Sequence, residues 1–516
     1  MGIDLGTTNT CVAVIEANKP TVVPNAEGGR TTPSVVAFTP DGNVLVGEPA
    51  RRQAVTNASG TITSVKRLMG LTRSSGKLAE ISRRAAYEIV PDEQGRVMVM
   101  ANGQLRSPIE ISAMILRAVR EAAEEYFGDD CSAAVICCPA YFDDTQRAAT
   151  HDAARVAGLD VLRIINEPTA AALAYSWSRG REGRIAIFDF GGGTFDCSVL
   201  DCKQGVVQVL STRGNSYLGG DDIDAKIVDH LKDGFYRLHG TEIGDDPVAA
   251  QRLREAAERA KIELSGVSET EVMLPFLAVD AAGPKHLQTT LTRARLEALV
   301  TPLVDEALRC CKQALEDANL APRDVEEVLL VGGSTKMPYV RKRVEEFFGQ
   351  ATRKGLNPDE AVAIGAAVQA ALLEGQTDDV LLMDVLPLSL GIAAGERFAA
   401  ILRRNQPIPT SRTERFSTVR DFQSSVLLKV YQGDREMARD NRLIGTFRLE
   451  NLPPARAGQV QIDVTFKVDE NGLLDVEGQD ARTGLKRTIS VRDSMRLSDD
   501  EIAALRGRIA TPETDL

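Results

Sequence analysis

FDFGGGTFD, residues 188–196, is an apolar strand ending at Asp189, followed by a triple-glycine turn and a return through Thr194 and Asp196. Glycine lets the backbone come close to a phosphate group and direct its N–H groups at it, and a threonine hydroxyl adds a further donor. An aspartate at the end of a strand can hold Mg²⁺ through water, because this ion keeps much of its hydration shell. The stretch therefore predicts a phosphate-binding turn between two strands.

A second turn of the same design lies near the N-terminus. IDLGTTNT, residues 3–10, contains Asp4, a glycine, and then Thr7 and Thr8. One such turn is more simply explained as a tight hairpin. Two matched turns, 185 residues apart (189 − 4), instead predict two similarly built lobes that face each other. A third turn, LLVGGSTKMP at residues 329–338, places another glycine pair after a buried strand.

Two charged residues complete a candidate phosphoryl-transfer site. Lys66, in SVKRLMG, can supply positive charge to a transferred phosphoryl group. Glu167 stands before Pro168, which suits the first turn of a helix, so Glu167 is expected at a helix start where it could orient or deprotonate a water. Taken singly, each has a simpler explanation, as a surface lysine and a capping glutamate.

Composition limits the class of protein. The 516 residues exceed what one core usually holds, and 43% hydrophobic and 26% charged residues are ordinary for a globular chain. A net charge of −12 without a basic block argues against general nucleic-acid binding. The eight cysteines and four histidines have no metal-ligand spacing, so we expect reduced, structural cysteines. The N-terminus lacks a signal-peptide pattern, which favours a cytoplasmic protein without a membrane segment.

The chain changes character near residue 380. Up to about residue 375, β-branched strands alternate with amphipathic helices such as residues 109–127 and 246–266, which is typical of α/β domains. From residue 386 only strands remain. QVQIDVTFKV at residues 459–468 alternates apolar and polar residues and precedes an Asn-Gly turn, which predicts an antiparallel β-domain. Ser498 and Glu501 then form a capping-box pattern for one short helix.

The two parts are joined by the apolar strip DVLLMDV, residues 379–385, which is too short to span a bilayer. Full burial of its four apolar residues, Val380 to Met383, would contribute about 6–12 kcal/mol as an upper bound. A two-state equilibrium needs about 5.5 kcal/mol to move almost fully from one state to the other. The strip is therefore predicted to be apolar enough to act as a switch.

These motifs, with RTTPSVV, CPAYFDDTQR, LGGDDID, NPDEAVAIGAA and DVLPLSLGI in the same order, closely resemble the 70-kilodalton heat-shock chaperones, particularly the DnaK type, from Gly2 to about Ile502. The resemblance implies an α/β, two-lobed, actin-like ATPase domain at 1–378, with lobes of roughly 1–185 and 186–378. It further implies an interdomain linker at 379–385, an antiparallel β-sandwich peptide-binding domain at 386–493, and a short helical stub at 494–516 in place of most of the family's lid.

The resemblance also implies a function. It is that of an ATP-dependent chaperone, an ATP hydrolase that binds extended hydrophobic segments of unfolded proteins and couples hydrolysis to their release through the linker. The implied ligands are ATP/ADP and Mg²⁺, with K⁺ left open, and the implied partners are unfolded polypeptides, a J-domain co-chaperone and a nucleotide-exchange factor. Two rival classes are a small-molecule kinase or filament protein of the same fold, and a family member that does not hydrolyse ATP. The linker and β-domain argue against the first, and Lys66, Glu167 and Thr194 against the second.

Residue roles follow from the resemblance by motif. The catalytic set would be Lys66, Glu167 and Thr194, and Asp4, Asp189 and Asp196 would surround Mg²⁺. Phosphates would contact Thr7, Thr8, Gly192, Gly193 and Thr194; adenosine would contact Glu258, Lys261, Ser265, Gly332, Gly333, Ser334, Lys336 and Asp359. A peptide pocket would include Ile392, Phe416, Val419, Val426, Leu428 and Leu473. Interdomain coupling would use Arg163, Asn166, Val380, Leu381, Leu382, Met383 and Asp384.

Three departures from the family pattern bear on these roles. Lys336 stands where arginine is common, and lysine stacks less well on an adenine ring. Val419 replaces a frequent alanine, and the segment GIAAGERF, residues 391–398, is about one residue shorter than the DnaK pattern. The geometry over the bound peptide is therefore expected to differ.

Overall fold

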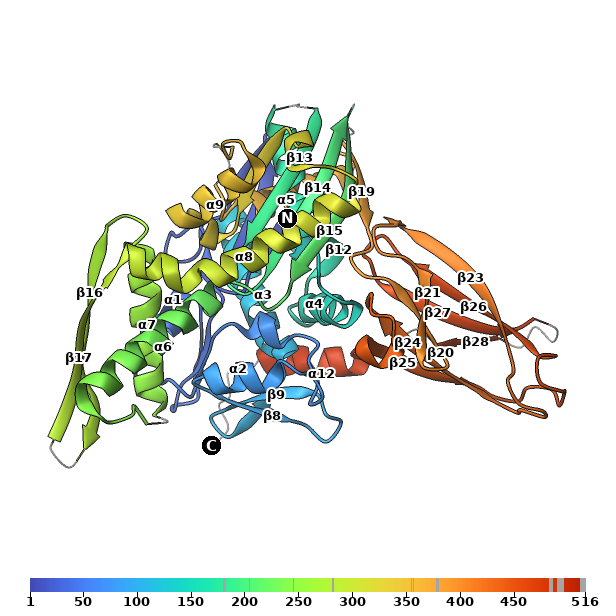
Figure 1. Ribbon diagram of the computed structural model, residues 1–516, viewed down its shortest axis with the longest axis horizontal. Helices are drawn as coiled ribbons and strands as arrows, with labels where there is room; N and C mark the ends of the chain where they lie inside the picture. The colour runs from blue at the N-terminus through green and yellow to red at the C-terminus, as the bar shows by residue number, and fades with distance from the viewer. Residues whose placement is uncertain are drawn as a thin grey trace.

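The computed structural model describes residues 1–179, 182–203, 205–244, 246–280, 283–353, 355, 357–376, 380–481, 486–489 and 496–510. Two α/β lobes lie together, and a β-domain projects from one side of them (Figure 1). None of the helices in the described ranges is long and apolar enough to cross a membrane. All eight cysteines are free and most of them are buried, as expected for structural residues.

The two lobes share one sheet pattern. In each, three consecutive antiparallel strands are followed by a later strand that pairs in parallel with the first of the three, which confirms the prediction of two similarly built lobes. The first sheet has the order β12-β11-β1-β2-β3, with bounds β1 Gly2–Leu5, β2 Asn9–Glu16, β3 Lys19–Val22, β11 Ala133–Cys138 and β12 Asp160–Asn166; β4 (Thr32–Pro33) pairs with β2.

The second sheet begins with the same pattern and then extends beyond it. Its order is β18-β13-β14-β15-β19-β22, with bounds β13 Gly183–Phe190, β14 Phe195–Lys203, β15 Val206–Asn215, β18 Glu327–Val331, β19 Leu381–Val385 and β22 Pro407–Ile408. Strand β13 is almost wholly buried, which explains its near-continuous apolar sequence.

Helices pack on both sheets, and side-chain caps set several of their starts. Ser107 accepts a hydrogen bond from the Glu110 N–H, and Asp143 forms a capping box with Gln146. The long helices are α3 (Pro108–Phe127), α4 (Asp144–Val156), α5 (Glu167–Arg179), α6 (Gly220–His239), α7 (Pro247–Glu263), α8 (Arg293–Asp317), α9 (Pro338–Phe348) and α10 (Ala361–Leu373).

Smaller elements build the outer part of each lobe. In the first lobe these are α1 (Glu48–Arg52), η1 (Val65–Leu68), α2 (Leu78–Arg84), β5 (Val36–Phe38), β6 (Val44–Val46), β7 (Thr61–Ile62), β8 (Glu88–Pro91), β9 (Val97–Ala101) and β10 (Gln104–Arg106). In the second they are the hairpin β16 (Glu269–Asp280) and β17 (Gly283–Thr292), with η2 (Pro322–Asp324) and η3 (Gly333–Lys336).

Helix α10 returns to the first lobe, although the sequence placed all of 186–378 in the second. Its Ala363 and Ala367 pack with Cys11 and Ala13 of β2. A Cβ on Gly365 would lie 1.7 Å from the carbonyl oxygen of Ala170 in α5, so only glycine permits this close helix–helix approach. Val362 and Ala366 of α10 lie in one hydrophobic cluster with Leu329 and Val331 of the second lobe, so this helix joins the two lobes.

The β-domain consists of two four-stranded antiparallel sheets that share one hydrophobic core, as the alternating pattern predicts. Along residues 460–468 every second residue is at most 5% exposed. One sheet has the order β21 (Arg397–Leu402), β20 (Leu390–Ala394), β24 (Val426–Gln432) and β25 (Arg442–Leu449). The other has the order β23 (Thr410–Ser417), β26 (Gln461–Val468), β27 (Leu474–Asp480) and β28 (Lys486–Ile489); η4 (Ala438–Asp440) precedes β25.

The apolar strip is a strand of the second lobe. As β19, it pairs in parallel with β15, with Leu381 opposite Val206, and in antiparallel fashion with β22. Leu382 is half-buried against the lobe, whereas Leu381 is 61% exposed. The burial in this docked arrangement is therefore smaller than the upper bound, which assumed four fully buried side chains. Asp379, the first residue of the predicted linker, lies outside the described residues.

The C-terminal helix α12 (Asp499–Ala510) begins with the predicted capping box, in which the Ser498 and Glu501 side chains bond each other's backbone N–H. It packs on the first lobe beside α3 and α4, rather than on the β-domain that precedes it (Figure 1). Its Ile502 is 4% exposed in the core of that lobe. Residues 490–495 and 511–516, part of the segments assigned to the β-domain and the stub, lie outside the described residues.

Candidate functional site

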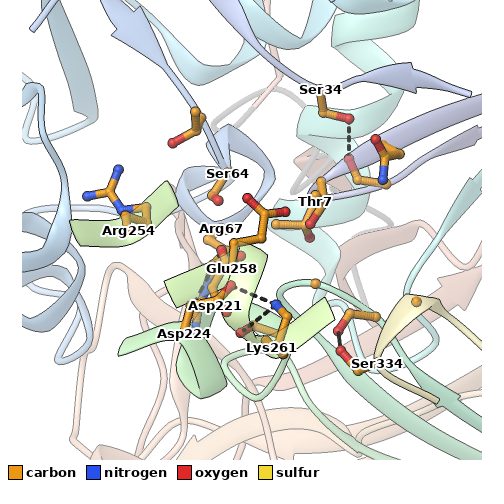
Figure 2. Close-up of a pocket in the computed structure, with 18 of the residues that line it drawn as sticks. Thr7, Ser34, Ser64, Arg67, Asp221, Asp224, Arg254, Glu258, Lys261 and Ser334 are labelled. Atoms are coloured by element: carbon orange, nitrogen blue, oxygen red, sulfur yellow. Dashed lines mark hydrogen bonds and ion pairs between the residues drawn. The ribbon is translucent and has the colours of Figure 1, made fainter. Parts of the chain in front are cut away.

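A cavity of about 1380 Å³ lies between the two lobes. The turns after β1, β13 and β18 open into it, together with η1 and the start of α5. Figure 2 labels Thr7, Arg67 and Ser334 among the lining residues. It brings together nearly all of the nucleotide-site residues predicted from the sequence: Asp4, Thr7, Thr8, Lys66, Glu167, Asp189, Gly192, Thr194, Glu258, Lys261, Ser265, Gly332, Gly333, Ser334, Lys336 and Asp359. Gly193 and Asp196 are not among the lining residues.

The two matched turns touch each other across the cleft. A Cβ on Gly192 would lie 2.0 Å from the Thr8 Oγ1, and one on Gly193 would lie 2.7 Å from the Thr7 Oγ1. Only glycine fits such contacts, so these residues let the two turns come into direct contact. This contact removes the alternative that each turn is an isolated hairpin.

Lys66 and Glu167 form a buried ion pair on one wall. The Lys66 Nζ lies 2.5 Å from the Glu167 Oε1, and the residues are 3% and 7% exposed, so Lys66 is not a surface lysine. Burial works against the charged form of Lys66, but the carboxylates of Glu167 and Asp4 outweigh it and raise the lysine pKa. Glu167 is the first residue of α5, where Pro168 follows it, as predicted. The wall therefore presents a fixed cation beside a fixed carboxylate.

Burial favours the neutral form of the carboxyl groups of the cleft aspartates. Burial raises the pKa of Asp4 to about 7, with Glu167 adding to the effect and Lys66 opposing it. Burial and the same glutamate raise the pKa of Asp189 well above its usual range. Among the described residues, the Asp189 Oδ2 has no hydrogen-bond partner. Such an arrangement fits a cation.

Asp196 connects the two lobes. It is opposite Asp189 in the ladder between β13 and β14, and its carboxylate accepts hydrogen bonds of 3.2 and 3.0 Å from the Ala140 and Tyr141 N–H groups of the first lobe. Burial raises its pKa to about 7, with Glu167 adding to the effect. Within the described ranges, no group of three or more His, Cys, Asp or Glu side chains is placed to hold a metal directly. The unpartnered Asp189 Oδ2, with the carboxyl groups of Asp4 and Asp196 nearby, fits Mg²⁺, an ion that keeps much of its hydration shell in proteins.

The other end of the cavity is built from α6, α7 and η3. The Lys261 Nζ is 2.7 Å from Asp224, and the Ser334 hydroxyl donates to the Gly191 carbonyl at 2.9 Å (Figure 2). Lys336 forms an ion pair with Asp359 at the rim. The sequence did not single out Asp224, although it stands in the LGGDDID motif; burial raises its pKa to about 7 against the opposing charge of Lys261.

Asp384 of strand β19 accepts hydrogen bonds from two residues that lie on either side of Glu167 in the sequence. Asp384 is 6% exposed and accepts hydrogen bonds from the Asn166 Nδ2 at 2.8 Å and the Thr169 hydroxyl at 3.1 Å. Arg147 in turn donates to the Asn166 side chain. Thr169 and Arg147 were not predicted, since nothing in their local pattern marks them. The predicted Arg163 is not joined to Asp384, and its Nε has no hydrogen-bond partner within the described residues.

The β-domain contacts both lobes through polar side chains. On the first lobe, Asp144 at the start of α4 accepts the Leu474 N–H at 2.8 Å, and Asp143 forms an ion pair with Arg442. On the second lobe, Arg404 pairs with Asp317 at 2.9 Å. These contacts join residues hundreds of positions apart, so no local sequence signal could have found them.

Five of the six predicted peptide-pocket residues lie near one end of the β-domain. Ile392 and Leu428 are buried in its core, Phe416 and Val426 are half-buried beside them, and Val419 is 79% exposed on the loop between β23 and β24. The loop is held by a hydrogen bond from the Thr418 N–H to the Val460 carbonyl.

Leu473 does not belong to this group, which corrects the sequence prediction. Strand β26 places Ile462 opposite Phe416, whereas Leu473 adjoins Leu474, the partner of Val468. Six residues of strand separate these positions, about 20 Å. The residue that faces the group is instead Ile462, which is 1% exposed. The alternation of residues 459–468 already marked Ile462 as inward-facing and could have identified it.

Comparison with known protein families agrees with this geometry. A family model described as Hsp70 protein matches residues 1–513. The match covers the cleft, the linker strand and the β-domain together. The chain therefore belongs to the Hsp70 family, whose members are ATP-dependent chaperones built on a two-lobed, actin-like ATPase fold.

Proposed function

We propose that this chain is a DnaK-type chaperone that hydrolyses ATP to ADP and phosphate and couples the reaction to binding and release of extended hydrophobic peptide segments. The ATPase part rests on the buried Lys66–Glu167 pair, the facing turns and the aspartates with raised pKa values. The peptide part rests on the apolar end of the β-domain, where Ile462 takes the place first assigned to Leu473.

In the proposed reaction, the N–H groups and hydroxyls of the two turns hold the phosphates. Lys66 directs its positive charge at the transferred phosphoryl group, and Glu167 positions the attacking water. Thr194 supplies a further hydroxyl beside Asp189. Mg²⁺, when bound with the nucleotide, would neutralise phosphate charge, and Asp4, Asp189 and Asp196 are the residues that would hold it and its waters. K⁺ remains a proposed further ion.

One observation carries the coupling. Asn166 and Thr169, which flank Glu167 and Pro168, both donate to Asp384 of the linker strand. A change in linker docking would therefore act on the residue that positions the water. Strand β13, which carries Asp189, and the linker strand β19 belong to the same sheet, in which β19 pairs with β15. The chain continues from β19 into the β-domain.

The β-domain is proposed to be a sandwich whose open end takes an extended apolar peptide, with backbone hydrogen bonds for affinity and a pocket for one side chain. Val419 is proposed to contact the peptide from outside, which its exposed position supports. Family members work with unfolded substrates, J-domain proteins and exchange factors, and we propose the same partners, in the cytoplasm, for this chain.

The test is steady-state ATP hydrolysis with and without an apolar peptide and a J-domain protein, in the presence and absence of Mg²⁺. We expect slow basal hydrolysis that needs Mg²⁺ and rises severalfold when peptide and J-domain protein are both present. Phosphorylation of a small molecule without response to peptide would favour the kinase alternative. Binding of ATP without turnover would favour a family member that does not hydrolyse it.

A further inference from the structure

Asp222 connects the two lobes at the side of the nucleotide cavity. It is the third residue of α6, in the second lobe, and its carboxylate accepts the Gly219 N–H of that lobe at 2.9 Å. Two arginines of the first lobe also bind it: Arg67 of η1 and Arg84, the last residue of α2. One carboxylate therefore holds three donors that come from both sides of the cleft.

The distances describe short, charge-assisted bonds. The Arg67 Nη2 lies 3.0 Å from the Asp222 Oδ2, and the Arg84 Nη1 lies 2.8 Å from the Oδ1. Glu80, one helical turn before Arg84, pairs with the other terminal nitrogen of Arg84 at 2.9 Å and orients its side chain. Asp222 is 7% exposed, so these bonds are less screened than bonds on an open surface.

A second tie crosses the cleft beside the first. Arg254 of α7, in the second lobe, donates to the backbone carbonyl of Arg84. Arg67, Arg84 and Arg254 all line the cavity, and Figure 2 shows Arg254, Arg67 and Asp221 on one side of it, away from Ser34 and Ser334. Helix α2 cannot separate from α6 and α7 unless both ties break.

We propose that Arg84, Asp222 and Arg254 form an ionic clasp that holds the two lobes closed over a bound adenine nucleotide and thereby limits its rate of release. The inference rests on the proposed function for the identity of the ligand. Arg84 acts as a positioning residue, because it holds the lobes together rather than the reacting atoms. Its side chain is 38% exposed, so salt or an approaching partner can compete for it, whereas Arg67 is almost wholly buried and keeps Asp222 paired when Arg84 is removed.

The test is stopped-flow release of a fluorescent ADP analogue from the full chain carrying Arg84→Ala. Arg83→Ala is the matched control, since Arg83 precedes Arg84 on the same helix and also lines the cavity, whereas its Nε donates to the Ala79 carbonyl within that helix. We expect release at least fivefold faster for Arg84→Ala at 0.05 M salt and within twofold of wild type for Arg83→Ala. At 1 M salt the difference should shrink to less than twofold, because the Arg84 side chain is 38% exposed and salt ions compete for its charge.

Arg84→Lys and a double-mutant cycle with Asp222→Asn make the test independent of folding defects. The lysine variant keeps the charge and should recover part of the slow release. The cycle should show non-additive effects of Arg84→Gln and Asp222→Asn on the release rate. Equal release from wild type, Arg84→Ala and Arg84→Lys, with normal nucleotide binding and hydrolysis, would overturn the clasp alone. Failure of the wild type to bind adenine nucleotide would overturn the proposed function and the clasp with it.

Discussion

Buried carboxylates occur in two regions of this protein, the cleft between the lobes and the contact between the ATPase lobes and the β-domain, and their surroundings differ. In the cleft, Asp4 and Asp189 lie near Glu167, which adds to the rise in their pKa values, and one lysine opposes it. At the domain contact, Asp384 and Asp144 accept hydrogen bonds from residues of the facing part.

This difference in surroundings indicates what kind of partner the carboxylates of each region are suited to bind. Carboxylates that raise one another's pKa are suited to a ligand that brings positive charge with it. Carboxylates that accept N–H and O–H donors from the facing domain are suited to that domain itself. Changes in the cleft should therefore affect the chemistry, and changes at the contact should affect the docking equilibrium.

The largest expected effect concerns Lys66 and Glu167, the buried ion pair on the wall of the cleft. Lys66→Ala should lower single-turnover ATP hydrolysis by about 10²–10³, the usual range when a preorganised electrostatic donor is lost, and Glu167→Ala by at least tenfold, about 1.4 kcal/mol of barrier. Rapid-quench measurement with excess enzyme checks both. Lys77→Ala is the control, because Lys77 is a half-exposed lysine on the rim of the same cavity. Wild-type turnover in the first two variants would remove both residues from the mechanism.

The next effect concerns Asp144 and pH. Burial raises the pKa of Asp144 to about 6 in the docked arrangement, compared with an ordinary value of 3.8, while the Leu474 N–H works against the rise. The docked form therefore holds a proton between about pH 4 and 6 that an undocked form releases. Docking should weaken as pH rises through this window, by up to about 3 kcal/mol, and show no further change above it.

Asp144→Asn removes that penalty and keeps an oxygen for the Leu474 N–H. We expect the variant to dock more strongly than wild type at pH 7 and to show little pH dependence from 4 to 7. Resonance energy transfer between labels on α4 and on β25, measured across this range, follows the equilibrium. Parallel pH curves for the two proteins would show that Asp144 does not control docking.

A smaller effect is expected at the linker aspartate. Asp384→Asn weakens the charge-assisted bonds to Asn166 and Thr169, a change of about 1.5–2 kcal/mol. Basal hydrolysis should be retained, whereas stimulation by peptide and J-domain protein should fall by about tenfold or more. Steady-state assays without partners, with each partner alone and with both together separate basal hydrolysis from stimulation by the peptide and by the J-domain protein. Normal stimulation in the variant would refute the coupling role of Asp384.

The smallest effect compares neighbouring linker leucines. Leu382 packs against the core of the second lobe, and Leu381 is mostly exposed. Leu382→Ser should weaken docking by about 1 kcal/mol, and Leu381→Ser by a few tenths at most. The same energy-transfer assay compares the two variants directly. A larger effect at Leu381 would mean that its exposed side chain is used by a partner rather than by the docked lobe.

Much of the cleft could be predicted because its chemistry is local in sequence. Each phosphate turn combines a strand-end aspartate, glycines and a threonine within nine residues, and Glu167 takes its position from the proline beside it. The inward face of residues 459–468 follows from a two-residue period in the same way. Such patterns depend only on residues close together in the sequence, so they can be recognised before the fold is known.

Tertiary structure alone decided the remaining features, because they depend on contacts between distant segments. Sequence could not show that Leu381 stays exposed while Leu382 packs, since both are apolar residues of one strand. It misplaced Leu473 because the register of β26 and β27, not residue type, determines which end of the sheets a side chain occupies. The pairing of Arg84 with Asp222 joins positions 138 residues apart, and only the closure of two lobes brings their charges together.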